Sequence, residues 1–286
     1  MNTIVVCGAS NVRTVVVENA KHLTSNPLPT FHTLFRNGLT QLQGQEHMAI
    51  HKALVCAVNS SMLQVATPRI HDMIRSRIAE WTEAGEVQGV NECERLNLDI
   101  GWEVVGGFRL DRHDSIRMRE DFETFSDGVF SLPVNVWPFS FRRAIHARAR
   151  LIELMKQRRN MHAEYPTYLD VISDVNNNNN NVETKSDDVT YECAFELLFG
   201  MMTTSSALAS AITFLHKRHD VIEQVRREGE RWAESGEYFR SDRELAARLP
   251  VTSAVVREVL RLRAPVAGGI RKATSDIHIE ASYRYE

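Results

Sequence analysis

The sequence predicts a mainly α-helical fold with a minor β portion. Apolar residues recur at helical spacing over long runs, and Thr190 to Leu215 is the most apolar of them. Thr3 to Cys7, TIVVC, is a short β-branched run of the kind that forms a strand. The chain has 286 residues, of which 43% are hydrophobic and 25% charged. These values are typical of a soluble globular protein with a substantial core.

Charge and cysteine content argue against several classes of protein. The formal net charge of −3 provides no basic surplus, so we expect no nucleic-acid partner. The four cysteines, Cys7, Cys56, Cys93 and Cys193, form no CxxC pair, and we expect buried thiols. No apolar run is expected to span a bilayer, and the N-terminus MNTIVVCGAS lacks the basic region of a signal peptide. As written, the chain is expected to be soluble and intracellular.

The N-terminal segment predicts a strand, a turn and a helix. The strand Thr3–Cys7 stops at Gly8, and Ser10 or Asn11 can cap a helix whose apolar stripe is Val12, Val15 and Val16. A strand, a glycine and a helix start also occur in dinucleotide-binding folds. That fingerprint needs three glycines, and only Gly8 is present, so a plain strand–turn–helix is favoured.

Helices are predicted along most of the remaining chain. Residues 46–80 carry Ile50, Leu54, Val55 and Val58 on one face, and a second helix is expected at about 70–81. The stretch SLPVNVWPFSFRR predicts an irregular loop, and His146, Arg148 and Arg150 beyond it predict a solvated helix face. The six asparagines at 176–181 predict a disordered surface loop. Other helices are expected at 96–105, 121–130, 144–159 and 219–232.

The run from Thr190 to Leu215 is apolar nearly all round, which predicts a buried helix. Gly200 and the hydroxyl residues 203–206 interrupt it near the middle. Hydroxyls inside a helix bond back to carbonyl groups and can bend it. The pattern fits either a kinked core helix or a helix that lies against a ligand, and these residues by themselves favour the first.

The segment REVLRLRAPVAGGIR, Arg257 to Arg271, follows a helix expected to start near Thr252, just after Pro250. Its predicted buried face comprises Val255, Val256, Val259 and Leu260. Glu258 and Arg261 lie one turn apart and can pair. Two interpretations remain open: an exposed helical ion pair, or a buried network that ties this helix to another part of the fold.

The order of these features resembles the cytochrome P450 family of haem-thiolate monooxygenases, and most closely its retinoic-acid hydroxylase branch. EVLR, Glu258 to Arg261, is similar to the family's ExxR in the K helix, and LRAPVAGGIR is similar to LNPPVPGGFR. ELLFGMMTTSSALAS is similar to ELLFGGHETTASAAT of the oxygen-activating I helix. FSLPVNVWPFSFRRAIHARA resembles FSLPIDVPFSG…ARN between the F and G helices, and HDVIEQVRREGE resembles the J helix. ASNVRTVVV is similar to ADNVRRILL near the B helix, and the resemblance runs from about Val5 to Ile279.

The resemblance implies a haem cofactor, an NADPH-dependent reductase and a lipophilic substrate such as retinoic acid or a sterol, at the endoplasmic reticulum membrane. Thr204 matches the threonine that handles dioxygen, beside Gly200. Glu258 and Arg261 match the buried ion-pair network. The resemblance also implies that Arg271, together with His51 or Lys52, binds the haem propionates. Val266 would contact the substrate.

The chain also departs from the family pattern. Thr203 stands where the family has an acid, and a hydroxyl is a poorer proton relay than a carboxyl group. Met201 replaces a glycine and is expected to narrow the oxygen groove. His47 replaces an aromatic residue, and the pair His47 and His51 without further ligands does not indicate a metal site.

The family's haem loop, FxxGxxxCxG, does not occur in these 286 residues. We therefore expect one incomplete monooxygenase domain over 1–286, from the B helix to just after the K helix, without the axial cysteine and the L helix. Such a chain is expected to be inactive as it stands and to expose an apolar flank of the 190–215 helix, so whether it acts as an enzyme stays open. The alternatives are a non-catalytic paralogue and a helical binding or interaction protein.

Overall fold

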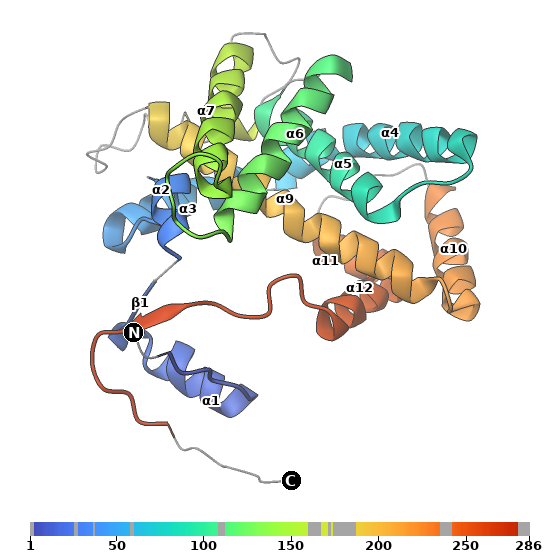
Figure 1. The fold of residues 1–286 in the computed structure, drawn as a ribbon. Coiled ribbons are helices and arrows are strands. Elements are labelled where there is room, and N and C mark those ends of the chain that lie inside the picture. Colours follow the sequence, from blue (N-terminus) through green and yellow to red (C-terminus); the bar gives the residue numbers. More distant parts are fainter. Residues whose placement is uncertain are drawn as a thin grey trace.

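The computed structural model describes residues 3–25, 28–36, 38–57, 60–107, 112–159, 167–170, 173, 187–234 and 242–279. The fold is mainly helical with a small sheet, as predicted (Figure 1). The asparagine run 176–181 lies outside the described residues. The helices are α1 Ala9–Arg13, α2 Pro29–Leu34, α3 Gly44–Ala57, α4 Ser60–Ala84, α5 Gly89–Gly101, α6 Arg112–Val129, α7 Ser140–Arg159, α9 Asp187–Leu215, α10 His219–Ala233, α11 Asp242–Arg248 and α12 Pro250–Leu262.

The sheet consists of two strands from opposite ends of the chain. β1, Leu23–Ser25, pairs antiparallel with β2, Arg271–Ala273, so that Leu23 faces Ala273. Figure 1 shows these strands and α1 apart from the main group of helices. The sheet therefore joins the two ends of the described chain to each other, outside the core.

The predicted strand at Thr3–Cys7 is wrong. These residues are irregular, and the side chains of Ile4 and Val5 are 82% and 83% exposed. A β-branched run becomes a strand only where another strand pairs with it, and here the pairing falls on Leu23–Ser25 instead. The helix that follows begins at Ala9 without a side-chain cap from Ser10 or Asn11.

The helix positions agree better with the prediction than the helix ends do. The run 46–80 contains two helices, α3 and α4, and the predicted helix 96–105 starts earlier and ends in a π-helical turn, Trp102–Gly106. The run 121–130 is the end of a longer helix, α6, that begins at Arg112. The loop after α6 is shorter than predicted, because α7 begins at Ser140.

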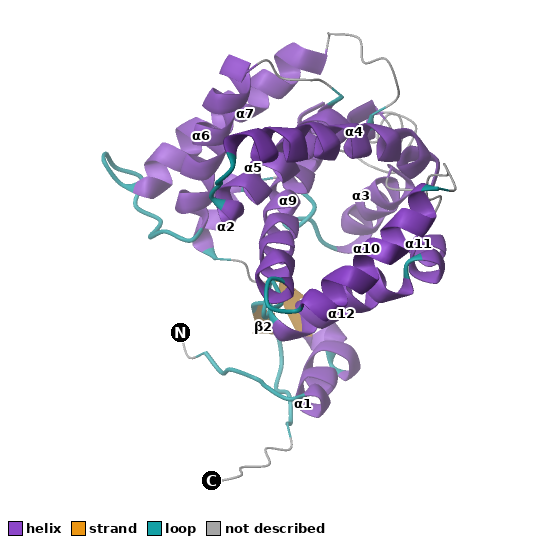
Figure 2. Ribbon diagram, turned by 90° about the vertical axis from the view of Figure 1, so that its right-hand side faces the viewer, coloured by secondary structure: helices purple, strands orange, loops and turns teal. Residues whose placement is uncertain are grey.

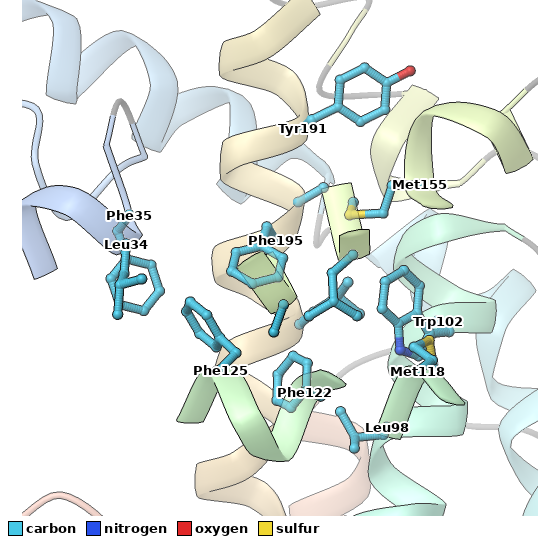
Figure 3. Packing of buried hydrophobic residues seen from close by; sticks show 14 of the residues in the cluster. Leu34, Phe35, Leu98, Trp102, Met118, Phe122, Phe125, Met155, Tyr191 and Phe195 are labelled. Atoms are coloured by element: carbon cyan, nitrogen blue, oxygen red, sulfur yellow. The ribbon is translucent and has the colours of Figure 1, made fainter. Parts of the chain in front are cut away.

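The core lies where α5, α6 and α7 surround the N-terminal half of α9 (Figure 3). Phe195 of α9 is fully buried, and its ring meets that of Phe125 of α6 edge-on with centroids 4.8 Å apart. Phe35, next to the end of α2, meets the other side of Phe125 at 5.6 Å. Edge-to-face aromatic contacts of this kind add stability beyond the area that they bury.

Helices α6 and α7 pack along each other as a close antiparallel pair. Gly128 of α6 permits this approach, because a Cβ at that position would lie 2.1 Å from the Cβ of Ala144. Two arginines of α7 complete the contact, since Arg150 pairs with Asp121 and Arg158 pairs with Asp114. The pair is thus held by a small-residue contact near its tip and by ion pairs farther along.

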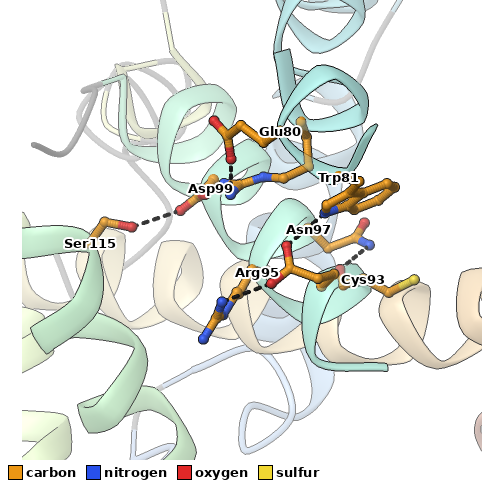
Figure 4. A network of polar contacts seen from close by, with 9 residues as sticks. Glu80, Trp81, Cys93, Arg95, Asn97, Asp99 and Ser115 are labelled. Carbon is orange, nitrogen blue, oxygen red and sulfur yellow. Dashed lines mark hydrogen bonds and ion pairs between the residues drawn. The ribbon is translucent and has the colours of Figure 1, made fainter. Parts of the chain in front are cut away.

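A polar network joins α4, α5 and α6 (Figure 4). Arg77 of α4 donates to Asp99 of α5 at 2.6 Å, and Ser115 of α6 donates to the other oxygen of Asp99 at 3.1 Å. Trp81 of α4 donates to Glu92 of α5 at 2.7 Å. Burial raises the pKa of Asp99 despite the opposing effect of Arg77, whereas hydrogen bonds from Trp81 and Arg95 outweigh burial and lower the pKa of Glu92.

His146 and Arg150 of α7 are exposed as predicted, whereas Arg148 is buried, so the prediction of a solvated face is wrong for Arg148. Its side chain donates to the carbonyl oxygen of Leu34 at 2.6 Å and pairs with Glu192 of α9. The guanidinium also lies over the ring of Phe195, 5.9 Å from its centroid. A charge this deep remains in the fold because its partners compensate for the lost water.

Candidate functional site

Helix α9 carries the candidate site, and its two halves have different surroundings (Figure 2). Tyr191, Phe195 and Leu198 are buried, whereas Ile212 and Phe214 are 49% and 39% exposed. The prediction of a helix buried all round is therefore wrong for the C-terminal half. The expected exposed apolar flank is present there.

By length and composition, Val189–Leu215 is also apolar enough to cross a membrane. This corrects the expectation that no run of that kind exists. Only 17% of its most apolar stretch is buried, yet the N-terminal half packs in the protein core. Core helices of soluble proteins pass the same test of composition, so this observation by itself places nothing in a bilayer.

The hydroxyl residues of α9 bond back to the helix as predicted. The Thr203 hydroxyl donates to the carbonyl oxygen of Gly200 at 2.7 Å, and the Ser205 hydroxyl donates to that of Met201 at 2.9 Å. The segment nevertheless remains α-helical from Asp187 to Leu215. Gly200 and Thr204 are exposed and, at a spacing of four residues, share one face of the helix.

Met201 is a neighbour of this face on the helix, but its side chain is directed at α5, which changes the meaning of the substitution noted in the sequence. A Cβ on Gly101 of α5 would lie 3.0 Å from the Met201 Cγ, so the Met201 side chain packs directly against α5. It joins the apolar cluster that contains Ile100 and Val104. Met201 therefore fills the contact between α5 and α9, and it does not narrow the face that carries Gly200 and Thr204.

The Glu258–Arg261 pair on α12 is formed but exposed. The guanidinium donates to both carboxylate oxygens at 2.7 Å, and the two side chains are 56% and 66% exposed. The hydrogen bond from Arg261 lowers the pKa of Glu258. The predicted buried face is also largely wrong, because Val256 and Leu260 are exposed and Val259 alone is buried among α12 residues. Of the two interpretations, the described residues show the exposed helical pair.

The remaining candidates lie on separate elements. His51 and Lys52 are exposed on α3, where the His51 ring stacks on His47 with centroids 5.7 Å apart. Arg271 is exposed on β2 and donates to the carbonyl oxygen of Ile270 at 3.0 Å. Val266, between α12 and β2, is 65% exposed. Among the described residues, no hydrogen bond, ion pair or ring contact joins these side chains into one site.

The two buried thiols, Cys93 and Cys193, do not suit an axial haem ligand. Burial raises the pKa of Cys193 to about 12 and also raises that of Cys93, so both remain protonated thiols, whereas a haem ligand must be a thiolate. Cys7 is exposed in the N-terminal segment, and the side chain of Cys56 lies outside the described residues. No cluster of three potential metal ligands is found in the part of the chain that is described. The described residues thus offer a haem the exposed face of α9 that carries Gly200 and Thr204, and Arg271 on β2.

Sequence reasoning missed a cavity of about 480 Å³ between α10, α11 and α12. It lies beside a buried carboxylate, Glu228, which is 3% exposed. Glu228 binds the start of α12, more than twenty residues farther along the chain. The sequence signal for the Glu228 contact is indirect. Leu249, which precedes Pro250, has no side-chain acceptor with which to cap α12, so the cap must come from another part of the chain. The lining residues are Glu228, Arg231, Trp232, Ala247, Arg248 and Pro250.

Comparisons with known proteins agree on one family. The model of the cytochrome P450 family matches residues 1–284. Cytochrome P450 26A1 of Xenopus laevis is 31% identical over 288 residues, which cover 95% of this chain and 58% of that protein. The putative cytochrome P450 120 of Synechocystis is 26% identical, over 98% of this chain and 63% of that protein.

The structural comparison gives the same fold. The solved structure of retinoic-acid-bound cyanobacterial CYP120A1 superposes with a TM-score of 0.82 at 24% identity, over 96% of this chain and 62% of that one. This chain thus spans about 60% of the length of the relatives that it matches. On the family match over nearly its whole length, the chain belongs to the cytochrome P450 family.

Proposed function

We propose that the protein acts as a haem-thiolate monooxygenase on a lipophilic acid such as retinoic acid. In such a reaction one oxygen atom of O2 enters a C–H bond, and the other takes up two protons and leaves as water, with two electrons from NADPH delivered by a reductase. The family match over residues 1–284 is the observation that carries the proposal. The retinoic acid bound to the structural relative, together with the hydroxylase-like motifs in the sequence, supports this substrate class.

The haem would supply the activation of dioxygen, and this chain would supply one wall around it. On α9, Gly200 leaves open space and Thr204 presents an exposed hydroxyl, which can donate a hydrogen bond to a bound polar ligand. Arg271 can pair with a carboxylate, and Val266 can contact an apolar substrate. The buried thiols Cys93 and Cys193 supply no axial ligand, so we assign no step of the reaction to them.

The absorption spectrum of the reduced, carbon-monoxide-treated full chain tests this proposal when haem is supplied during expression. A strongly red-shifted Soret band shows a thiolate on iron, and its loss in Cys7→Ser or Cys56→Ser identifies the ligand. Mass spectrometry of retinoic acid incubated with the protein, NADPH and a microsomal reductase then detects the hydroxylated product. Absence of both the band and the product contradicts the proposal for this chain.

The role of Thr204 is tested with a matched control on the same helix. Thr204→Ala should lower product yield per NADPH consumed, because it removes the exposed hydroxyl beside Gly200. Thr213→Ala removes another exposed hydroxyl, one that bonds back to the Ala209 carbonyl at 2.8 Å, and should leave the yield unchanged. Equal yields in the two variants would remove Thr204 from the proposed site.

A second function, binding of a lipophilic acid without turnover, is favoured by Thr203. This residue stands at the position of the family's acid, and its hydroxyl already donates to the Gly200 carbonyl. A hydroxyl held in this way is a weak proton relay compared with a carboxyl group. Retinoic acid binding without product, followed by product in Thr203→Glu, would identify this as the correct function. Product formation by the unaltered chain would reject it.

We further propose that the protein works at the surface of the endoplasmic reticulum membrane. The exposed loop between α6 and α7 supports this, since Phe130, Leu132 and Trp137 are 74%, 72% and 73% exposed. Exposed apolar patches of this kind mark membrane or protein contacts. Flotation with phosphatidylcholine vesicles should recover the wild-type chain, and the double variant Leu132→Ser, Trp137→Ser should remain in the soluble fraction. Equal flotation of both would remove the loop from the proposal.

A further inference from the structure

Helix α12 receives its N-terminal cap from a different helix. Leu249, which precedes α12, has no polar side chain, and Pro250 has no N–H group. The next two backbone N–H groups, those of Val251 and Thr252, donate to the two oxygens of Glu228 on α10 at 2.9 and 2.8 Å. The Thr252 hydroxyl donates to the same carboxylate at 2.7 Å.

This arrangement satisfies the first turn of α12 completely. The N–H of Ser253 donates to the carbonyl oxygen of Leu249 at 2.9 Å, so each backbone donor from Pro250 to Ser253 has a partner. Glu228 is 3% exposed, and its negative charge lies at the positive end of the helix dipole. Charge-assisted, two-pronged hydrogen bonds in a site with little water fix direction as well as distance.

Helix α12 also lies against α9 and α11, but few of its apolar side chains are buried there. Val259 is its buried residue among those described, whereas Val256, Leu260 and Leu262 are 50%, 41% and 53% exposed. Non-directional apolar contacts of this extent fix the orientation of a helix less sharply than hydrogen bonds do. Figure 2 shows α10, α11 and α12 side by side, with the start of α12 close to α10. The Glu228 carboxylate is therefore the main directional contact at this end of the helix.

We propose that Glu228 is a positioning residue that sets the orientation of α12, and with it the Glu258–Arg261 pair and the segment that leads to Arg271. This inference rests on the proposed function, because the orientation of α12 affects catalysis only where this part of the chain supports a haem. The Glu228 side chain acts through α12 and touches no reacting atom.

The charges around Glu228 keep it ionised at neutral pH. Burial by itself raises the pKa of Glu228. The hydrogen bonds from Thr252 and Val251 and the charge of Arg231 together lower it by more than burial raises it, so the pKa lies below its ordinary value. The other charged group that lines the adjacent cavity is Arg248 of α11, which pairs with Glu244 at 3.3 Å. The first turn of α12 contributes no acidic residue. We call the hydrogen bonds from Val251 and Thr252 to the Glu228 carboxylate the clamp. The stability that the clamp contributes is present above the ordinary pKa of a glutamate and is lost as pH falls through the lowered pKa of Glu228.

Amide hydrogen exchange of the full chain measures the clamp without haem. Glu228→Gln keeps the shape of the side chain but replaces one of the two acceptor oxygens with an NH2 group. This group cannot accept a hydrogen bond from the second backbone N–H. Exchange over residues 251–262 should become roughly 10-fold faster in this variant at neutral pH. Glu230→Gln, an exposed change on the same helix, should leave exchange as in the wild type. The difference between Glu228→Gln and wild type should vanish in acid, and unchanged exchange at neutral pH overturns the clamp.

The positioning role is tested on the haem-loaded protein. The share of the carbon monoxide complex with a thiolate-type Soret band should fall in Glu228→Gln and stay constant in Glu230→Gln. Faster exchange with an unaltered spectrum overturns the positioning role while leaving the clamp in place. A wild-type protein without any such band overturns the proposed function and the positioning role together, and the exchange result then still decides whether Glu228 holds α12.

Discussion

The two halves of α9 both carry apolar residues at helical spacing, but their environments differ. In the N-terminal half, Phe195 is fully buried between α6 and α7, and Glu192 pairs with Arg148. In the C-terminal half, Ile212 and Phe214 are exposed, and Gly200 has open space around its Cα. Apolar residues at helical spacing thus specify the helix in both halves, whereas neighbouring elements decide whether a side chain is buried. Substitutions that are matched between the buried and the exposed parts make this difference measurable.

The largest expected difference is between two phenylalanines of α9. Phe195→Ala should lower the free energy of unfolding by about 4 kcal/mol, because it opens a cavity among packed rings. Phe214→Ala, with a ring that is 39% exposed, should change it by less than about 1 kcal/mol. Urea denaturation followed by circular dichroism measures both. Similar losses would show that the C-terminal half is also packed in solution.

The next difference is between two arginine–glutamate pairs. Arg148→Met should cost about 3 kcal/mol, because it leaves the Glu192 carboxylate buried without its countercharge. Arg261→Met removes the partner of exposed Glu258 and should leave the unfolding free energy unchanged within error. The same urea titrations apply. A loss in Arg261→Met as large as that in Arg148→Met would mean that the α12 pair is buried in solution.

Two glycines should respond to the same substitution with opposite signs. Gly128→Ala places a Cβ 2.1 Å from that of Ala144 and should destabilise the protein by about 1–3 kcal/mol. Gly200→Ala meets no atom within 4 Å and should stabilise α9 by up to about 1 kcal/mol, because alanine favours a helix. Thermal melting of both variants gives the signs. Destabilisation by Gly200→Ala would show that another group packs against this face.

The smallest expected effect is a pH dependence at the loop that follows α2. Thr40 donates to Glu196 of α9 through its backbone N–H and its hydroxyl. Burial nevertheless raises the pKa of Glu196, with a further contribution from Glu192, because the hydrogen bonds from Thr40 and Leu39 only partly oppose it. A carboxyl group with a raised pKa contributes stability at low pH that is lost as pH rises through the folded-state value.

Glu196→Gln tests this sign, since the amide stays neutral and can still accept one hydrogen bond. The stability of the wild type relative to Glu196→Gln should fall as pH rises from acid to neutral. Unfolding free energies measured across this range give the slope. A slope of opposite sign would mean that the hydrogen bonds from Thr40 outweigh burial and that the pKa of Glu196 is lowered.

The sequence predicted helix positions and the back-bonding hydroxyls of α9 well, because both depend on neighbours within one or two turns. It failed where a distant partner decides the outcome. Thr3–Cys7 has the composition of a strand but no strand beside it, and Val256 and Leu260 have helical spacing but little to pack against. In the sequence, nothing distinguishes Arg148 from its exposed neighbours. Its burial follows from contacts with Leu34 and Glu192, which are distant in the sequence.

The candidate site followed the same rule. The family motifs select Gly200, Thr204, Glu258 and Arg261 as candidates, but they did not predict how exposed these residues are in this structure. Met201 reads as a replaced glycine in the motif, and only its contact with Gly101 shows which way it points. Glu228 has no local signature at all, because its partners lie 23 and 24 residues away.

The pairing of β1 with β2 has a consequence for how the chain folds during synthesis. Leu23 and Ala273 are 250 residues apart, so this ribbon joins two segments that are far apart in the sequence. At typical translation rates, β1 leaves the ribosome about 12–50 s before its partner exists. The α6–α7 pair needs only local contacts and can form long before that. The sheet can therefore form only after β2 has been synthesised, and until then the segment from Thr3 to Ser25 lacks this partner.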